Sequence, residues 1–148
     1  MITNGLTAGL FAAYSYAVMP GLGRADDRTF VEAMQRTNAA ILNGWFGLCF
    51  GGAVVFSVLA VGLHRGRPGW GWIVAGLLLY VAVLGVTFAV NVPLNDALAA
   101  AGPTDPAAAR AAFEGAWVRW NVLRAVLSTG AFGCLVVGAL VVAGRLEA

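Results

Sequence analysis

Residues 113–124, FEGAWVRWNVLR, lead without a break into the uncharged run 125–144. Several side chains of this stretch recur every three or four residues and would share one face of a helix: Glu114, Trp117, Asn121 and Arg124. The pattern carries polar, aromatic and cationic groups into a segment that resembles a membrane span. Because such groups cost free energy in hydrocarbon unless they find partners, this face is a candidate functional site.

The composition indicates a membrane protein. Of the 148 residues, 60% are hydrophobic and 11% are charged, a more apolar balance than soluble domains have. Four long uncharged runs cover residues 2–23, 37–63, 68–95 and 125–144, and about 20 apolar residues suffice to cross a bilayer. The sequence therefore predicts an all-α fold, a four-helix transmembrane bundle whose second and fourth helices extend beyond the membrane.

We expect one integral membrane domain over residues 1–148, with spans at about 2–22, 36–63, 70–92 and 118–144. The first run lacks the basic start and small-residue exit of a cleaved signal peptide, so we expect it to be retained. The basic residues Arg65, Arg67 and Arg145 mark one side as cytoplasmic, together with both termini. The predicted location is a bacterial inner or plasma membrane.

Two helix starts can be read from capping residues. Asp26 and Asp27 precede the second helix, and either side chain can accept a hydrogen bond from its first turn. Asp105 followed by Pro106 has the cap and first-turn proline typical of a helix start. The fourth helix should therefore begin outside the membrane and run into it.

The expected course of the second and third helices rests on fewer signals. The second should continue without interruption to about Leu63, with Asn43 deep inside it. Pro93 lacks an N–H group and clashes with the preceding turn, so the third helix should end near Asn91 and leave carbonyl groups free.

Connectivity brings four polar clusters into the same half of such a bundle. Antiparallel helices place the end of the first, the start of the second, the end of the third and the entry of the fourth together. The candidate site residues in these clusters are Tyr14, Met19, Gln35, Asn38, Asn91, Asn95, Glu114, Trp117, Trp120, Asn121 and Arg124. They could form an apolar pocket with a few convergent polar groups. The same side chains also fit a structural network that ties the helices together, with aromatic rings at the membrane interface.

Other chemistry finds little support in the sequence. His64, the one histidine, lies in a basic loop away from the polar half, and we interpret it as solvated. Cys49 and Cys134 are isolated in apolar runs, as small packing residues often are. No metal-ligand spacing occurs, and the net charge of +2 without a basic cluster does not indicate nucleic-acid binding.

Four segments resemble motifs of the anthrone-oxygenase-like integral membrane family, a domain of unknown function. They are YSYAVMPGL (14–22), FVEAMQRTNAAILNGWF (30–46), NVPLN (91–95) and ARAAFEGAWVRWNVLRA (109–125), and their order also matches. The resemblance implies four transmembrane helices and a monooxygenase that converts a lipophilic anthrone or related polycyclic phenol to a quinone. It implies dioxygen as co-substrate and no metal, flavin or haem cofactor.

The resemblance also suggests roles for the candidate residues. Arg124, Asn121 and Glu114 would be catalytic, with Arg124 stabilising a phenolate or peroxide oxygen. The remaining candidates would bind substrate: Trp117 and Trp120 by stacking, Asn38, Asn91 and Asn95 by orienting its oxygens, and Tyr14, Met19 and Gln35 as further contacts. The base would be Glu32, Glu114 or Tyr14, unless the substrate's own acidity suffices.

A second hypothesis uses the same pocket without catalysis. The protein would then bind a membrane lipid, a quinone or a partner helix in the polar half of the bundle. Glycine stripes on the first two helices would also suit a homo-oligomer. The two hypotheses differ in whether Arg124 is needed for a reaction or for stability alone.

Overall fold

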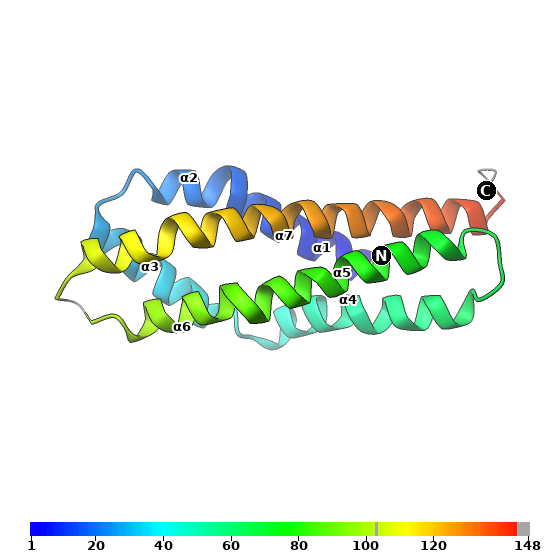
Figure 1. Ribbon diagram of the computed structural model, residues 1–148, viewed down its shortest axis with the longest axis horizontal. Coiled ribbons are helices and arrows are strands. Elements are labelled where there is room, and N and C mark those ends of the chain that lie inside the picture. Colours follow the sequence, from blue (N-terminus) through cyan, green and yellow to red (C-terminus); the bar gives the residue numbers. More distant parts are fainter. Residues whose placement is uncertain (103, 145–148) are drawn as a thin grey trace.

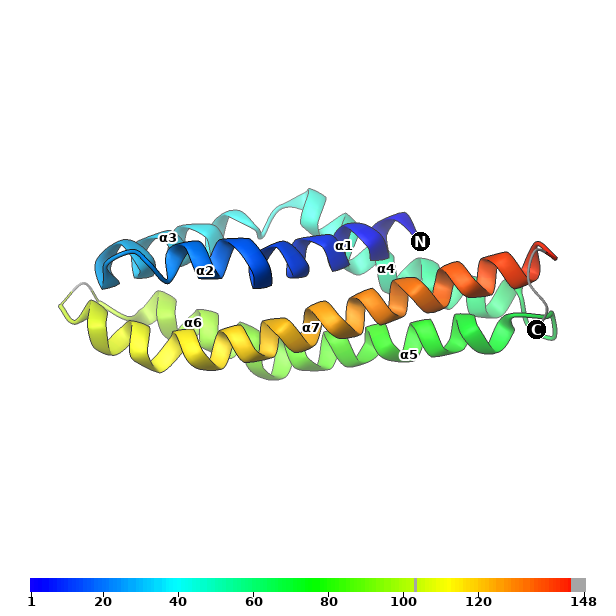
Figure 2. The ribbon, with the colours of Figure 1, turned by 90° about the horizontal axis from the view of Figure 1, so that it is seen from above.

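The computed structural model describes residues 1–102 and 104–144, and all regular secondary structure in them is helical. The elements run along one long axis (Figure 1). In order they are α1 (Ile2–Ala13), the π-helix η1 (Tyr14–Val18), α2 (Met19–Leu22), α3 (Asp27–Ala40), α4 (Gly44–Leu63), α5 (Trp70–Val86), the π-helix η2 (Thr87–Asn91), α6 (Val92–Ala100) and α7 (Pro106–Val142). From above, α1, α2 and α3 lie on one side and α5, α6 and α7 on the other (Figure 2).

The all-α prediction is confirmed, whereas the count of four spans is not. Within residues 1–102 and 104–144, three helical segments are long and apolar enough to cross a membrane: Gly44–Leu63, Trp70–Ala100 and Pro106–Val142. The first predicted span, at residues 2–22, is not among them. Its polar side chains, such as the buried Asn4 and Thr7, make it less hydrophobic than those three segments.

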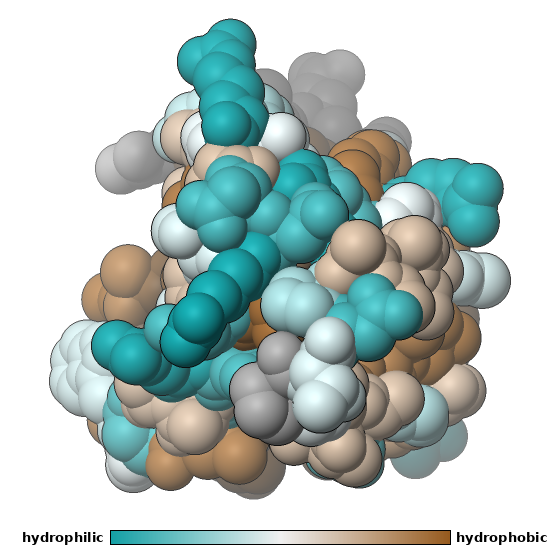
Figure 3. Space-filling model, turned by 90° about the vertical axis from the view of Figure 1, so that its left-hand side faces the viewer, coloured by the Kyte–Doolittle hydropathy of each residue, from teal (hydrophilic) through white to brown (hydrophobic). Residues whose placement is uncertain are grey.

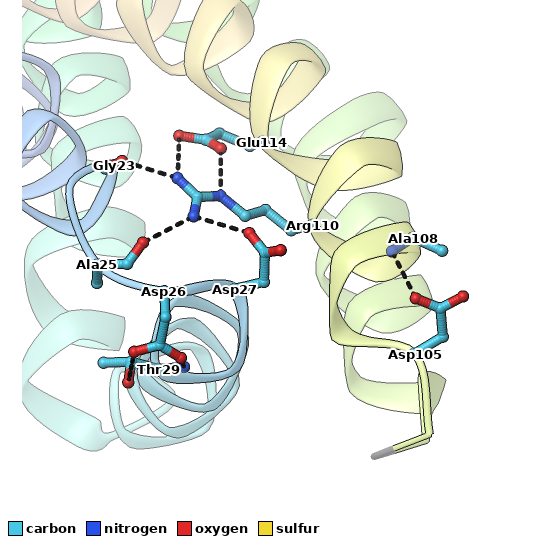
Figure 4. A network of polar contacts seen from close by, with 9 residues as sticks. All are labelled: Gly23, Ala25, Asp26, Asp27, Thr29, Asp105, Ala108, Arg110 and Glu114. Atoms are coloured by element: carbon cyan, nitrogen blue, oxygen red, sulfur yellow. Dashed lines mark hydrogen bonds and ion pairs between the residues drawn. The ribbon is translucent and has the colours of Figure 1, made fainter.

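Capping side chains start α3 and α7 as predicted. Asp26 accepts a hydrogen bond from the Thr29 backbone N–H at 3.0 Å, and Asp105 accepts one from that of Ala108 at 2.9 Å (Figure 4). The hydroxyl of Thr29 also donates to Asp26, and these hydrogen bonds lower the pKa of that carboxyl group below its usual value. Local polar chemistry therefore sets both helix starts.

The prediction of one continuous second helix is wrong. Residues 41–43 separate α3 from α4. The Asn43 side chain accepts from the Phe46 backbone N–H at 3.0 Å and donates to the Ala40 carbonyl at 2.9 Å, so it caps both helix ends. Beside this bend, Leu42 and Trp45 are 79% and 70% exposed, as expected of apolar side chains at a membrane surface.

The predicted stop near Asn91 is also wrong, because helical structure continues to Ala100. The five-residue turn of η2 accommodates Pro93. The Val92 N–H donates to the Thr87 carbonyl, and the proline, which has no N–H, falls in the first turn of α6. η1 stands in the same relation to Pro20, which falls in the first turn of α2.

Two buried clusters hold the elements together. One, in the middle of the bundle, contains Phe11, Phe50, Tyr80 and Val83, and the Tyr80 hydroxyl donates to the Phe50 carbonyl at 2.9 Å. The other packs α3, α6 and the start of α7 around aromatic and methionine side chains: Met19, Phe30, Val31, Met34, Leu98, Phe113 and Trp117. The polar half therefore has its own core beside the candidate site.

The end of the molecule with the α2–α3 and α6–α7 loops carries much hydrophilic surface (Figure 3). There Arg110 binds three elements at once (Figure 4). Its guanidinium donates to Glu114 at 2.7 Å, to Asp27 at 3.0 Å and to the Gly23 and Ala25 carbonyls at 2.9 Å each. These bonds fix the α2–α3 loop against α7.

Candidate functional site

A cavity of about 310 Å³ lies in the polar half of the bundle, within the size range of small-molecule sites. Its walls come from the α1–η1 junction, the α3–α4 bend, η2 with α6, and the middle of α7. Both π-helices and the bend therefore border the cavity. π-Turns inside α-helices frequently mark functional sites.

Most of the predicted site residues meet at this cavity. Those that line it are Tyr14, Gln35, Asn38, Asn91, Asn95, Trp117, Asn121 and Arg124. Met19 instead lies in the adjoining core, and Glu114 is bound to Arg110. Trp120 is 38% exposed and is not among the residues that line the cavity.

Arg124 is a buried cation without a carboxylate partner in the described part of the chain. Its side chain is 6% exposed, and its guanidinium carbon lies 4.3 Å from the ring centre of Phe11 and 5.5 Å from that of Trp117. Attraction to the two aromatic faces offsets part of the cost of burying the charge. The Nε of Arg124 has no hydrogen-bond acceptor.

Asn121 holds this arginine in place. Its Oδ1 accepts from Arg124 Nη2 at 2.8 Å, while its Nδ2 donates to Ser15 Oγ at 2.9 Å and to the Phe11 carbonyl at 3.1 Å. These contacts join α7 to the α1–η1 junction. Asn121 therefore positions the guanidinium and has little hydrogen-bonding capacity left for a ligand.

Two further asparagines have unused hydrogen-bonding groups. Asn91 is 1% exposed, and neither its Nδ2 nor its Oδ1 has a hydrogen-bond partner among the residues that the structure describes. Asn38 Nδ2 is likewise buried and unpaired. A buried polar group without a partner costs about 1–3 kcal/mol, so these amides are good candidates for contacts with a bound molecule.

The other polar residues that line the cavity form contacts between the helices around it. The Trp117 indole N–H donates to Asn95 Oδ1 at 2.9 Å, which joins α7 to α6. Gln35 Nε2 donates to the Leu98 carbonyl at 2.8 Å, which joins α3 to α6. Tyr14 packs against Trp117, with ring centres 5.8 Å apart.

Several lining residues are not among the predicted site residues, and these include Phe11, Thr37, Thr87 and Asp96. Phe11 lies three residues before Tyr14, and this spacing could have revealed it. Thr87 lies four residues before Asn91, and the same helical spacing could have revealed it. Asp96 directly follows Asn95, but it lies beyond the predicted helix end near Asn91.

The fold and the cavity together define a class of protein, an all-helical integral membrane protein with a buried, partly unpaired polar site. The chain belongs to the anthrone oxygenase family: the family model described as "Anthrone oxygenase" matches residues 30–134. The match includes the motifs at 30–46, 91–95 and 109–125, whereas the motif at 14–22 lies outside it. Comparisons with curated proteins and with solved structures gave no match.

Proposed function

We propose that this protein is a membrane-embedded, cofactor-independent oxygenase that converts a lipophilic anthrone or related polycyclic phenol to a quinone. The observation that carries the proposal is the environment of Arg124. A buried cation lies over Phe11 and Trp117, beside a cavity that also contains the unpaired amide of Asn91. A planar aromatic molecule with an ionised oxygen would supply the missing partner.

The proposed reaction balances without a cofactor. The methylene carbon of an anthrone loses a proton, and the resulting anion adds dioxygen. Protonation gives a hydroperoxide, which loses water to leave the second carbonyl group. The net change is that one substrate and one dioxygen give one quinone and one water.

The cavity residues suit this sequence of steps. Arg124 would stabilise the anionic oxygen as charge develops on it, and such preorganised groups are effective where water is excluded. Trp117 and Phe11 would contact the fused rings. Asn91 and Asn38 would hydrogen-bond to the oxygen substituents, and Asn121 would keep Arg124 in position.

We also propose a membrane arrangement with four spans. Residues 2–22 would form the additional span beside α4, α5 and α7, since the Asn4 side chain donates to the Ala53 carbonyl and to Ser57 of α4. Both termini would then be cytoplasmic. α3, α6 and the start of α7 would extend beyond the opposite surface, which places the cavity near that interface.

A non-enzymatic binding protein is the second candidate function. The observation in its favour is the apolar edge of the cavity at the α3–α4 bend, where Ile41, Leu42 and Phe46 are lining residues. Leu42 is exposed, so this edge would suit a lipid or a quinone. Binding of this kind would not require turnover.

Oxygen consumption tests the proposed function. Purified protein in detergent, given emodin anthrone, should consume one dioxygen per quinone formed and exceed the rate of autoxidation in protein-free buffer. Product would be followed by absorbance and oxygen by an electrode. A rate equal to autoxidation, together with saturable binding of the quinone, would instead support the second candidate.

A further inference from the structure

We infer that the Asp96 carboxylate is the proton acceptor of the cavity. It would take the acidic proton of the bound ligand and release it to water. This inference rests on the proposed function, to which it adds the base that the sequence did not identify. It concerns the proton transfer alone and can be tested without oxygen.

The acidic side chains of the protein differ in whether they have partners. In the described part of the chain, every acidic side chain except Asp96 has a hydrogen-bond or ion-pair partner. Asp26 and Asp105 cap helices, Asp27 and Glu114 bind Arg110, and Glu32 binds Arg28 and Arg36. Asp96 is therefore the described carboxylate that is free to accept a proton.

Asp96 is also the one described acidic residue among those that line the cavity. The expected bases Glu32 and Glu114 are not lining residues, and their carboxylates are bound to arginines. Tyr14 does line the cavity, but a neutral phenol is a weaker base than a carboxylate.

Hydrogen bonds to other helices fix the part of α6 that carries Asp96. Its neighbour Asn95 accepts the hydrogen bond from the Trp117 indole, and Gln35 binds the Leu98 carbonyl one turn further along α6. These contacts anchor the helix segment that carries Asp96. The carboxylate itself is exposed, so a proton taken from the ligand can pass to water.

Charge placement gives the ligand an orientation. Arg124 is buried, whereas Asp96 lies at the exposed rim of the same cavity. The ligand oxygen would face Arg124 and its acidic C–H bond would face Asp96. When that bond breaks, the proton moves to Asp96 and the electron pair is delocalised onto the oxygen beside the cation.

Anaerobic hydrogen–deuterium exchange measures this step directly. Anthrone would be incubated with detergent-purified protein in D2O under argon, and loss of the methylene proton signal followed by NMR. The protein should accelerate exchange, and Asp96→Asn should reduce the acceleration by about 100-fold or more, the usual contribution of a general base. Asp96→Glu, which keeps a carboxylate, should restore much of it.

Asp105→Asn is the matched control. It removes another carboxylate from the same end of the molecule, and asparagine caps a helix as well as aspartate does. Exchange should be unchanged in this variant. Melting temperatures would verify that all three variants are folded.

The outcomes separate the inference from the proposed function. Wild-type exchange that Asp96→Asn does not slow would overturn the inference, and so would oxidation of anthrone without anaerobic exchange. In both cases an oxygenase would remain, with another source of proton transfer. If wild-type protein accelerates neither exchange nor oxidation, the inference and the proposed function both fail for this substrate.

Discussion

Arg110 and Arg124 lie on the same helix, about four turns apart, in opposite chemical situations. Arg110 donates to two carboxylates and two backbone carbonyls at the hydrophilic end of the molecule (Figure 4). Arg124 is more deeply buried, yet it donates to one amide oxygen and has an unpaired Nε. One arginine has the bonds expected of a structural tie, whereas the other has unused hydrogen-bonding capacity beside a cavity.

The largest expected effect is that of Arg124→Gln on turnover. Loss of a preorganised group that stabilises an anion typically lowers kcat by about 10²–10³-fold. The melting temperature should not fall, because the variant also removes a buried charge that has no carboxylate partner. Oxygen uptake with emodin anthrone and thermal unfolding would measure the two effects.

Arg119→Gln is the control for this variant, since Arg119 is an exposed arginine on the same helix. Its activity and stability should match those of the wild type. If Arg124→Gln lost stability but kept its turnover, Arg124 would stabilise the fold as Arg110 does and would have no role in the reaction.

Asn91→Leu should separate stability from function. Leucine is similar in size to asparagine, and it removes two buried polar atoms that have no hydrogen-bond partner among the described residues. The free energy of unfolding should therefore increase by about 1–2 kcal/mol. Activity should decrease at the same time, because the ligand loses an amide contact. Denaturant titration and the KM for anthrone would test the pair of effects.

The matched control is Asn43→Ala, which removes an asparagine whose side chain, unlike that of Asn91, is hydrogen-bonded at both its oxygen and its nitrogen. Asn43 caps α4, so this variant should lose about 1 kcal/mol of stability. A loss of stability in Asn91→Leu as well would show that the Asn91 amide is satisfied, and that it is not reserved for a ligand.

Arg110→Gln should lower the stability of the protein and leave its turnover unchanged, the opposite of what we expect for Arg124→Gln. Its hydrogen bonds to charged groups join α7 to the α2–α3 loop at a partly solvated site, so we expect a loss of about 1–2 kcal/mol. Turnover per folded molecule should be unchanged, because Arg110 does not line the cavity. The exposed Arg28→Gln would serve as control and should show no measurable loss of stability.

The smallest effect is expected for Trp117→Phe. The aromatic face below Arg124 is kept, while the hydrogen bond to Asn95 is lost, at a cost of about 1 kcal/mol. Turnover should fall only a few-fold if Trp117 acts through its ring. A loss as large as that of Arg124→Gln would show that the link between α6 and α7, and not stacking, controls the site.

The candidate site was predictable where it follows from connectivity. Asn38, Asn91, Asn121 and Arg124 come from segments distant in sequence, and antiparallel packing alone brings them to one cavity. Trp120 could not have been set aside from the sequence, because it lies three residues after Trp117 and four before Arg124 and so shares their face of the helix. Only its exposure in the structure distinguishes it from them. Asp96 could not have been recognised, since its significance depends on the partners of all the other carboxylates.

By itself, the sequence determined the helical class of the fold and the starts of α3 and α7, because apolar runs and capping side chains act locally. It did not determine the bend at residues 41–43 or the π-turns before Pro20 and Pro93. Contacts between helices decided those features. Asn43 satisfies the backbone at the bend by local hydrogen bonds, and each π-turn precedes a proline, but the same residues also fit a continuous helix or a helix end. Packing against the neighbouring helices decides among these forms. The Arg124 cavity lies among these irregular turns, so its shape could come only from the tertiary structure.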